Sequence, residues 1–215
     1  MRAATSLCFG VFAAALLAKS ALPQDSAEKA LSLYAVGIGG GHGIYLGKGL
    51  IITAAHVVGL LPRVKIAGNE VAAKIVKRGD LDDVDLTLLS IDEEIPARLG
   101  LGSISLCRNP AGTGEPVFVV LPEKVTQTYV LSQSLLPPNI PAKFQTVIRD
   151  VGSANSGTGV FDAKEKCLLG IVSRKISAVQ MKQVNGETVR EPIDIAKYFV
   201  PAAEIANFMP PDVRF

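Results

Sequence analysis

Short apolar runs rich in β-branched residues recur along almost the whole chain, and Gly, Pro, Asn or Asp separate them. A dozen such runs stand at 33–38, 43–46, 50–53, 63–67, 71–76, 85–91, 116–121, 126–131, 143–148, 159–161, 167–173 and 177–182. Runs of this length with turn residues between them are typical of an antiparallel sandwich or a pair of barrels. The predicted fold class is therefore all-β.

The composition suits such a fold. Apolar residues make up 48% of the chain, enough to bury a core, and charged residues make up 20%, which argues against disorder. Helical periodicity is clear only at residues 200–208, with Pro201 in the first turn and Pro210 beyond the end. The sequence thus predicts one short C-terminal helix.

One segment of the chain favours a division into two parts. Residues 92–115 are rich in Gly, Pro and charge, and no repeat of fixed period is visible. We expect an N-terminal β unit at residues 33–104, and a second β unit with the terminal helix at residues 105–215. Residues 21–32 are expected to be a short, weakly structured leader.

The first twenty residues have the features of a secretory signal peptide. Arg2 gives a positive start and residues 7–18 form an apolar run. Ala18, Lys19 and Ser20 then place small residues at the positions a signal peptidase reads. A membrane anchor is the weaker alternative, because a bilayer span needs about 20 apolar residues. Cleavage after Ser20 and a periplasmic or secreted protein are predicted.

Without this signal the chain is near neutral. Removing Arg2 and Lys19 leaves 20 of the 22 basic residues against 20 acidic ones, which gives no reason to expect binding to nucleic acid or an anionic membrane. Cys8 leaves with the signal. Cys107 and Cys167 are compatible with one disulfide or with two buried free thiols. No cofactor is expected, and no metal, since the histidines and cysteines lack ligand-pair spacing.

Only two histidines occur, and one of them ends an apolar strand. His56 closes the segment IITAAH, which resembles the histidine motif of the trypsin/chymotrypsin-like serine proteases, a hydrophobic strand followed by Thr-Ala-Ala-His. Upstream, GHGI at residues 41–44 resembles the Gly-Ser-Gly-apolar segment of that family, with His42 in place of the serine. A lone histidine at a strand end is more often structural, and this motif is what favours catalysis.

The resemblance implies an acid at the start of a later strand. Asp85 directly precedes the run LTLL, as the acid does in the family's Asp-Leu/Ile-Ala-Leu/Val-Leu motif. A carboxylate there would accept a hydrogen bond from the imidazole and stabilise its protonated form. Asp80, Asp82 and Asp83 are alternatives that fit a solvated acidic turn.

The nucleophile motif follows in the second half. The segment GSANSGTGVF at residues 152–161 resembles the family's Gly-Asp/Asn-Ser-Gly-Gly motif, with Ser156 as the attacking serine. The order His, Asp, Ser is that of chymotrypsin. The later segment LGIVS resembles the strand that lines the substrate cleft, so Ile171, Val172 and Ser173 are predicted substrate-binding residues.

The resemblance covers residues 41–208 and implies two six-stranded antiparallel barrels of the chymotrypsin type, with the catalytic residues in the crevice between them. It implies a serine endopeptidase that forms an acyl-enzyme, with His56 and Asp85 from the first barrel and Ser156 from the second. The backbone N–H groups of Ala154 and Ser156 would form the oxyanion hole. Proteins or peptides are the implied partners.

Several positions depart from the family pattern. Ala154 and Thr158 replace glycines of the nucleophile loop, and alanine costs roughly 1 kcal/mol if the loop needs φ > 0 there. These two residues favour the competing interpretation, a trypsin-like fold kept as a binding or regulatory protein with weak turnover. Asn155 replaces the aspartate of zymogen-activated relatives, so exported bacterial peptidases are the nearer resemblance. About sixty residues follow Ser156, so the PDZ module that some of those peptidases carry is not expected here.

The sequence contains few indications of substrate specificity. Asp150 lies six residues before Ser156, the spacing at which trypsin carries the acid that attracts Lys or Arg. The alternative is a loop aspartate paired with its neighbour Arg149. Arg174 and Lys175 follow Ser173 where small residues normally leave the pocket wall open, so they are expected to alter access.

Overall fold

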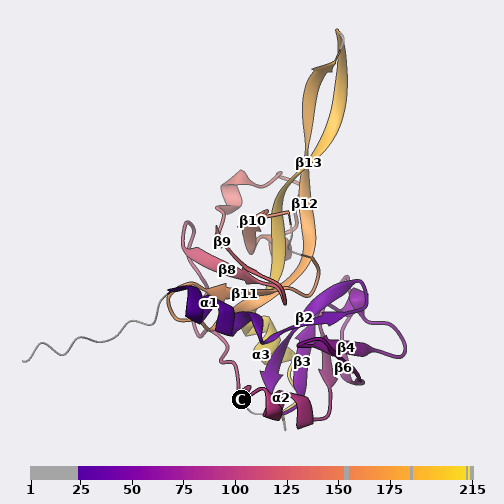
Figure 1. Ribbon diagram of the computed structural model, residues 1–215. Coiled ribbons are helices and arrows are strands. Elements are labelled where there is room, and N and C mark those ends of the chain that lie inside the picture. The colour runs from indigo at the N-terminus through magenta and orange to yellow at the C-terminus, as the bar shows by residue number, and fades with distance from the viewer. Residues whose placement is uncertain (1–23, 153–154, 185, 212, 214–215) are drawn as a thin grey trace, which may run out of the picture.

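The computed structural model describes residues 24–152, 155–184, 186–211 and 213. Two antiparallel sheets dominate it, one of seven and one of six strands, and a short helix follows the last strand (Figure 1). The all-β class predicted from the sequence is confirmed. The predicted signal peptide lies outside the described residues. Within those residues, no helix is both long and apolar enough to cross a membrane.

The first sheet has one strand more than the six expected. Its order is β5-β4-β1-β2-β3-β7-β6. The strands are β1 (Ala35–Ile38), β2 (Gly41–Gly47), β3 (Leu50–Thr53), β4 (Arg63–Ile66), β5 (Asn69–Ala72), β6 (Lys74–Arg78) and β7 (Thr87–Ser90). The extra strand arises at Ala73, whose N–H donates to the Pro62 carbonyl while β5 pairs with β4 and β6 with β7. Because Ala73 alone separates the two outermost strands, the sheet curls back on itself as a barrel does.

The second sheet has the order β10-β13-β12-β11-β8-β9. Its strands are β8 (Pro116–Val120), β9 (Val125–Tyr129), β10 (Val147–Arg149), β11 (Gly159–Asp162), β12 (Leu168–Val184) and β13 (Glu187–Pro201). An isolated antiparallel bridge joins Val130, the residue after β9, to Ile148 in the middle of β10, and β9 and β10 are the two outermost strands. This sheet therefore also closes toward a barrel.

Strands β12 and β13 are much longer than their neighbours and project from the body as a two-stranded ribbon (Figure 1). We call residues 177–184 and 187–194 of this ribbon the arm. The sequence predicted separate strands at 167–173 and 177–182 and no strand at Glu187–Pro201, whereas β12 runs through both runs and pairs with β13 along its length. Val179, Met181 and Val189 are exposed on the arm.

A single core cluster joins the two sheets. Ile44 and Leu88 of the first sheet and Phe161 and Ile171 of the second are all fully buried in it. Burying one such side chain stabilises the fold by roughly 1.5–3 kcal/mol. The walls of any crevice between the sheets are therefore held by a common interior.

Three α-helices and three 3-10 turns complete the described part of the chain. They are α1 (Gln24–Ser32), α2 (Glu94–Arg98), α3 (Ala202–Phe208), η1 (Ala55–Val57), η2 (Gln133–Leu135) and η3 (Ala142–Phe144). Helix α3 is the predicted C-terminal helix, with Ile205 and Phe208 buried and Pro201 at its N-cap rather than in its first turn. The leader expected to be weakly structured is helical in α1, because Leu31 is buried in the core.

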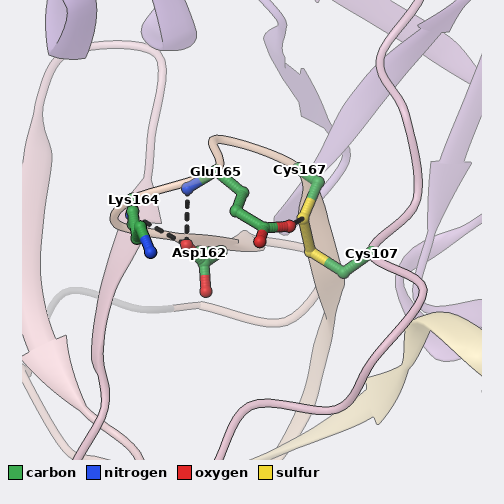
Figure 2. The surroundings of a disulfide bond; sticks show 5 residues. All are labelled: Cys107, Asp162, Lys164, Glu165 and Cys167. Carbon is green, nitrogen blue, oxygen red and sulfur yellow. Dashed lines mark hydrogen bonds between the residues drawn. A yellow bond between two sulfur atoms is a disulfide. The ribbon is translucent and has the colours of Figure 1, made fainter.

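A disulfide fastens the segment that joins the two sheets to the second sheet. Cys107 and Cys167 are bonded, with an S–S distance of 1.96 Å (Figure 2). The same segment is held to both sheets by backbone hydrogen bonds, from Ile104 to the Leu46 carbonyl and from Cys107 to the Leu168 carbonyl. The segment at residues 92–115, which the sequence predicts to divide the two units, is therefore fixed to the sheets by a disulfide and by backbone hydrogen bonds.

Candidate active site

His56 and Asp85 meet at the edge of the first sheet. His56 lies in the 3-10 turn η1, three residues after β3 ends, and its side chain is 32% exposed. Its Nδ1 lies 2.8 Å from Oδ2 of Asp85, and its backbone N–H donates to Oδ1 at 3.2 Å. Two contacts to one carboxylate fix both the ring and the backbone of the histidine.

The Asp85 carboxylate is buried, with a side chain only 2% exposed, two residues before β7 begins. A buried anion is tolerated when hydrogen-bond donors surround it. Besides the two groups of His56, the hydroxyl of Ser173 donates to Oδ2 at 2.6 Å. Ser173 comes from β12, so this carboxylate also links the two sheets.

A β-bulge makes Ser173 available for this role. The register of β12 against β13 shifts between Val172 and Arg174, which leaves Ser173 out of the ladder. Bulges of this kind re-aim side chains and are frequent beside active sites. The carbonyl of Ser173 accepts a hydrogen bond from Oγ of Ser156 at 3.0 Å, so Ser173 contacts both Asp85 and the candidate nucleophile.

The loop that carries Ser156 is held by backbone contacts to both sheets. The Ser156 carbonyl accepts a hydrogen bond from the His42 N–H at 2.9 Å, and Gly157 N–H donates to the Val172 carbonyl at 2.7 Å. Gly157 has φ +86°, which favours glycine, and it packs directly against the His42 carbonyl. The nucleophile loop is thus seated on β2 and β12.

Replacing Gly157 by alanine should destabilise the protein by about 2–3 kcal/mol, combining a strained φ with overpacking. A Cβ there would lie 1.8 Å from the His42 carbonyl oxygen, so the loop must shift. Urea denaturation measures the loss. Gly68→Ala is the matched control, since Gly68 has φ +84° and no atom within 4 Å of the added Cβ, and it should cost only about 1 kcal/mol. Equal losses at both positions would contradict the packing argument.

His42 occupies the position of the family's serine and packs behind the nucleophile loop. Its Nδ1 lies 3.3 Å from the Thr158 hydroxyl, and its carbonyl accepts a hydrogen bond from the Thr53 hydroxyl. Burial lowers the pKa of His42 below 6.5, and the charge of Glu123 opposes this in part. The folded protein therefore favours the neutral ring.

This lowered pKa predicts acid sensitivity. Well above pH 6.5 His42 is neutral in both the folded and the unfolded state, so its contribution to stability is complete there. As the pH falls from 6.5 through the lower folded-state pKa, the unfolded chain takes up the proton first and this stability is lost, by at most about 1.4 kcal/mol per pH unit. Denaturation curves should show a shallower pH dependence over this range in His42→Gln. An NMR titration midpoint for the His42 ring at or above 6.5 would contradict it.

A cleft with a volume of about 460 Å³ opens at His56 and Ser156. It is also lined by Leu81, Asn155, Val172, Ser173, Arg174, Lys175 and Lys197. The structure therefore brings His56, Ser156, Val172 and Ser173 together, with Asp85 buried behind the ring. Ala154, predicted for the oxyanion hole, lies outside the described residues.

Two predicted substrate-binding residues do not line this cleft. Ile171 is fully buried in the core, because it points to the opposite face of β12 from Val172. Asp150 accepts a hydrogen bond from the Gly152 N–H and lies 3.6 Å from Nζ of Lys197. Its ion-pair partner is therefore Lys197 of β13, not the neighbouring Arg149.

The sequence did not predict that Leu81 and Lys197 line the cleft. It predicted Arg174 and Lys175 only as residues that alter access to the substrate pocket. Lys197 stands directly opposite Lys175 in the register of β12 and β13. Strand β13 was not predicted, so no signal in the sequence placed Lys197 there. Among the described residues, no cluster of three or more His, Cys, Asp or Glu side chains could hold a metal ion.

Two antiparallel sheets that each curl toward a barrel, with this cleft between them, are typical of the trypsin/chymotrypsin-like fold, and comparison with solved structures shows that the chain has it. The chain is similar to the active form of the Rv3671c protease from M. tuberculosis, at 18% identity and a TM-score of 0.58, over 86% of this chain and 82% of that one.

Two further structures are similar to a comparable degree. The MamO protease domain from Magnetospirillum magneticum is 20% identical with a TM-score of 0.53, over 84% of this chain and 97% of that one. A kallikrein-related peptidase 10 structure is 15% identical with a TM-score of 0.57, over 83% and 94%. No protein-family model and no curated protein sequence matches the chain. The fold is that of trypsin-like proteases, and identities this low establish the fold alone.

Proposed function

We propose that this protein is a serine endopeptidase with His56, Asp85 and Ser156 as its catalytic residues. The observation that carries the proposal is the buried Asp85 carboxylate, which holds the His56 ring at 2.8 Å in the cleft that Ser156 also lines. A carboxylate on Nδ1 leaves Nε2 of the imidazole as the free base. That is the arrangement required to activate a serine hydroxyl.

In the proposed reaction, His56 removes the proton of the Ser156 hydroxyl as Oγ attacks the scissile carbonyl. The same proton then passes to the leaving amine, whose departure leaves an acyl group on Ser156, and water releases it. Asp85 stabilises the charged imidazole throughout. Backbone N–H groups of Ala154 and Ser156 are the proposed oxyanion donors, and loss of one such donor typically slows turnover about 100- to 1000-fold.

A second candidate function follows from the position of the Ser156 hydroxyl. It donates to the Ser173 carbonyl, which favours a resting arrangement in which the nucleophile is turned away from its base. In an active enzyme, rotation about χ1 of Ser156 moves the hydroxyl to Nε2 of His56 when substrate enters. A protein in which this rotation does not occur would be a binding or regulatory protein with weak turnover.

Labelling with a fluorophosphonate probe separates the two. An active nucleophile forms a covalent adduct at Ser156, identified by peptide mass spectrometry, and Ser156→Ala and His56→Ala abolish it. Ser134→Ala, which removes an exposed serine that does not line the cleft, should label like the unmodified protein. No adduct on the folded protein would overturn the enzyme proposal in favour of the binding protein.

We further propose that the protein is exported and acts on proteins or peptides in the periplasm or outside the cell. Residues 1–20 have signal-peptide features, and a cysteine pair joined by a disulfide suits an oxidising compartment. Mass spectrometry of protein from a fractionated host should find an N-terminus at Ala21. A cytoplasmic protein that keeps residues 1–20 would contradict export.

A further inference from the structure

The cleft beside Ser156 carries an excess of positive charge. Three cations line it, Arg174, Lys175 and Lys197, and none of its lining residues is a carboxylate. Lys175 and Lys197 lie directly opposite each other on β12 and β13. Like charges directly opposite each other on neighbouring strands repel. Each lysine therefore needs an anion nearby, either from this chain or from an occupant of the cleft.

Two of the three cations have a carboxylate partner that does not itself line the cleft. Lys197 lies 3.6 Å from Asp150, and both side chains are largely buried. Lys175 lies 3.1 Å from Asp194, at the surface. Asp150, which would attract a basic substrate residue if it were free, is thus already paired with a lysine of this chain.

Arg174 has no carboxylate partner among the described residues. Its Nη2 donates to the Leu81 carbonyl, and its guanidinium carbon lies 4.0 Å from the centre of the Phe144 ring. Its Nε is buried, and within the described part of the chain it has no hydrogen-bond partner. These neutral contacts fix the guanidinium in place and leave its charge uncompensated. A guanidinium held in this way suits a carboxylate, which it binds with charge-assisted hydrogen bonds.

We propose that this cleft selects substrates with an acidic side chain, aspartate or glutamate, at the position that enters beside Ser156, and that Arg174 is the main determinant of that selection. The proposal rests on the proposed function, since it names the substrate class of the same site. It reverses the preference for Lys or Arg that the position of Asp150 suggests in the sequence.

The test measures peptide binding to the Ser156→Ala protein, so that binding is separated from turnover. Peptides acetylated and amidated at their ends carry one central Glu, Gln or Lys, which makes the side chain the only source of the carboxylate. We expect the Glu peptide to bind at least about tenfold more tightly than the Gln peptide, and the Lys peptide to bind most weakly. The difference should shrink as salt is added.

Variants assign the effect to the cleft. Arg174→Gln should reduce the Glu-to-Gln ratio to near one, and Arg174→Lys should keep part of it. Lys175→Gln changes an exposed side chain, so it leaves the fold intact, and should reduce the ratio less. Arg190→Gln on the arm is the matched control and should leave the ratio unchanged. Equal affinity for Glu and Gln, a preference for Lys, or no binding of the Glu peptide overturns the proposal.

Fluorophosphonate labelling of the unmodified protein keeps the two proposals distinguishable. If Ser156 is labelled and no acidic preference appears, the specificity proposal fails while the protease proposal stands. If Ser156 is not labelled, the protease proposal fails, and the ratio between the Glu and Gln peptides still decides whether the cleft recognises a carboxylate.

Discussion

Asp85→Asn should lower the turnover number of the proposed reaction by about 10⁴-fold. A neutral amide cannot stabilise the protonated His56 ring, and its NH2 group favours the wrong imidazole tautomer. KM should change little, because Asp85 is buried behind the ring and does not line the cleft. Steady-state kinetics on a peptide that the unmodified enzyme cleaves would measure both constants.

Asp83→Asn is the matched control for this variant. Asp83 is an exposed neighbour in the preceding acidic turn, and removing its charge should leave turnover within a factor of about two, since exposed charges interact weakly. If Asp83→Asn were as damaging as Asp85→Asn, the catalytic acid would be assigned to the wrong aspartate. If neither slowed turnover, the triad itself would be refuted.

Loss of the disulfide should reduce the free energy of unfolding by roughly 4 kcal/mol. Cys107 and Cys167 are 60 residues apart, and closing a loop of that length restricts the unfolded chain by about this amount. Urea denaturation of the Cys107→Ala/Cys167→Ala protein measures the change. Neither cysteine lines the cleft, so peptide cleavage under native conditions should continue.

Reductant supplies the internal control for this prediction. Dithiothreitol should shift the unfolding midpoint of the unmodified protein toward that of the double variant and leave the double variant unchanged. An unmodified protein that is insensitive to reductant would mean that the two cysteines are free thiols in solution, the alternative that the sequence allows.

Much of the fold could be predicted because strands buried along most of their length leave short, continuous apolar runs in the sequence. Strands such as β3 and β8 are almost wholly buried and coincide with predicted runs. The first half of strand β13 could not be predicted because residues 187–194 are exposed and carry Pro192 and several charges, so no buried face marks them. The single run predicted at 71–76 could not show its break at Ala73, which depends on partners from two other strands.

Site residues that belong to a local sequence motif could be predicted. Contacts that depend on how two strands pair could not. Ile171 and Val172 could not both line one cleft, because successive residues of a regular strand point to opposite faces, and Ser173 lines it beside Val172 only because of the bulge between Val172 and Arg174. The Asp150 and Lys197 pair forms only because the end of β10 lies beside β13, which spacing along the chain does not reveal.

The arm has a consequence for the behaviour of the protein in concentrated solution. Beyond the barrel, in the part of the chain that the structure describes, no third strand flanks this ribbon. Both margins therefore present free backbone donors and acceptors, a template on which another ribbon could assemble and seed aggregates. Lys182, Arg190 and Glu191 place charge along these margins, and Pro192 removes one donor. Such residues act as gatekeepers that oppose the pairing of one ribbon with another.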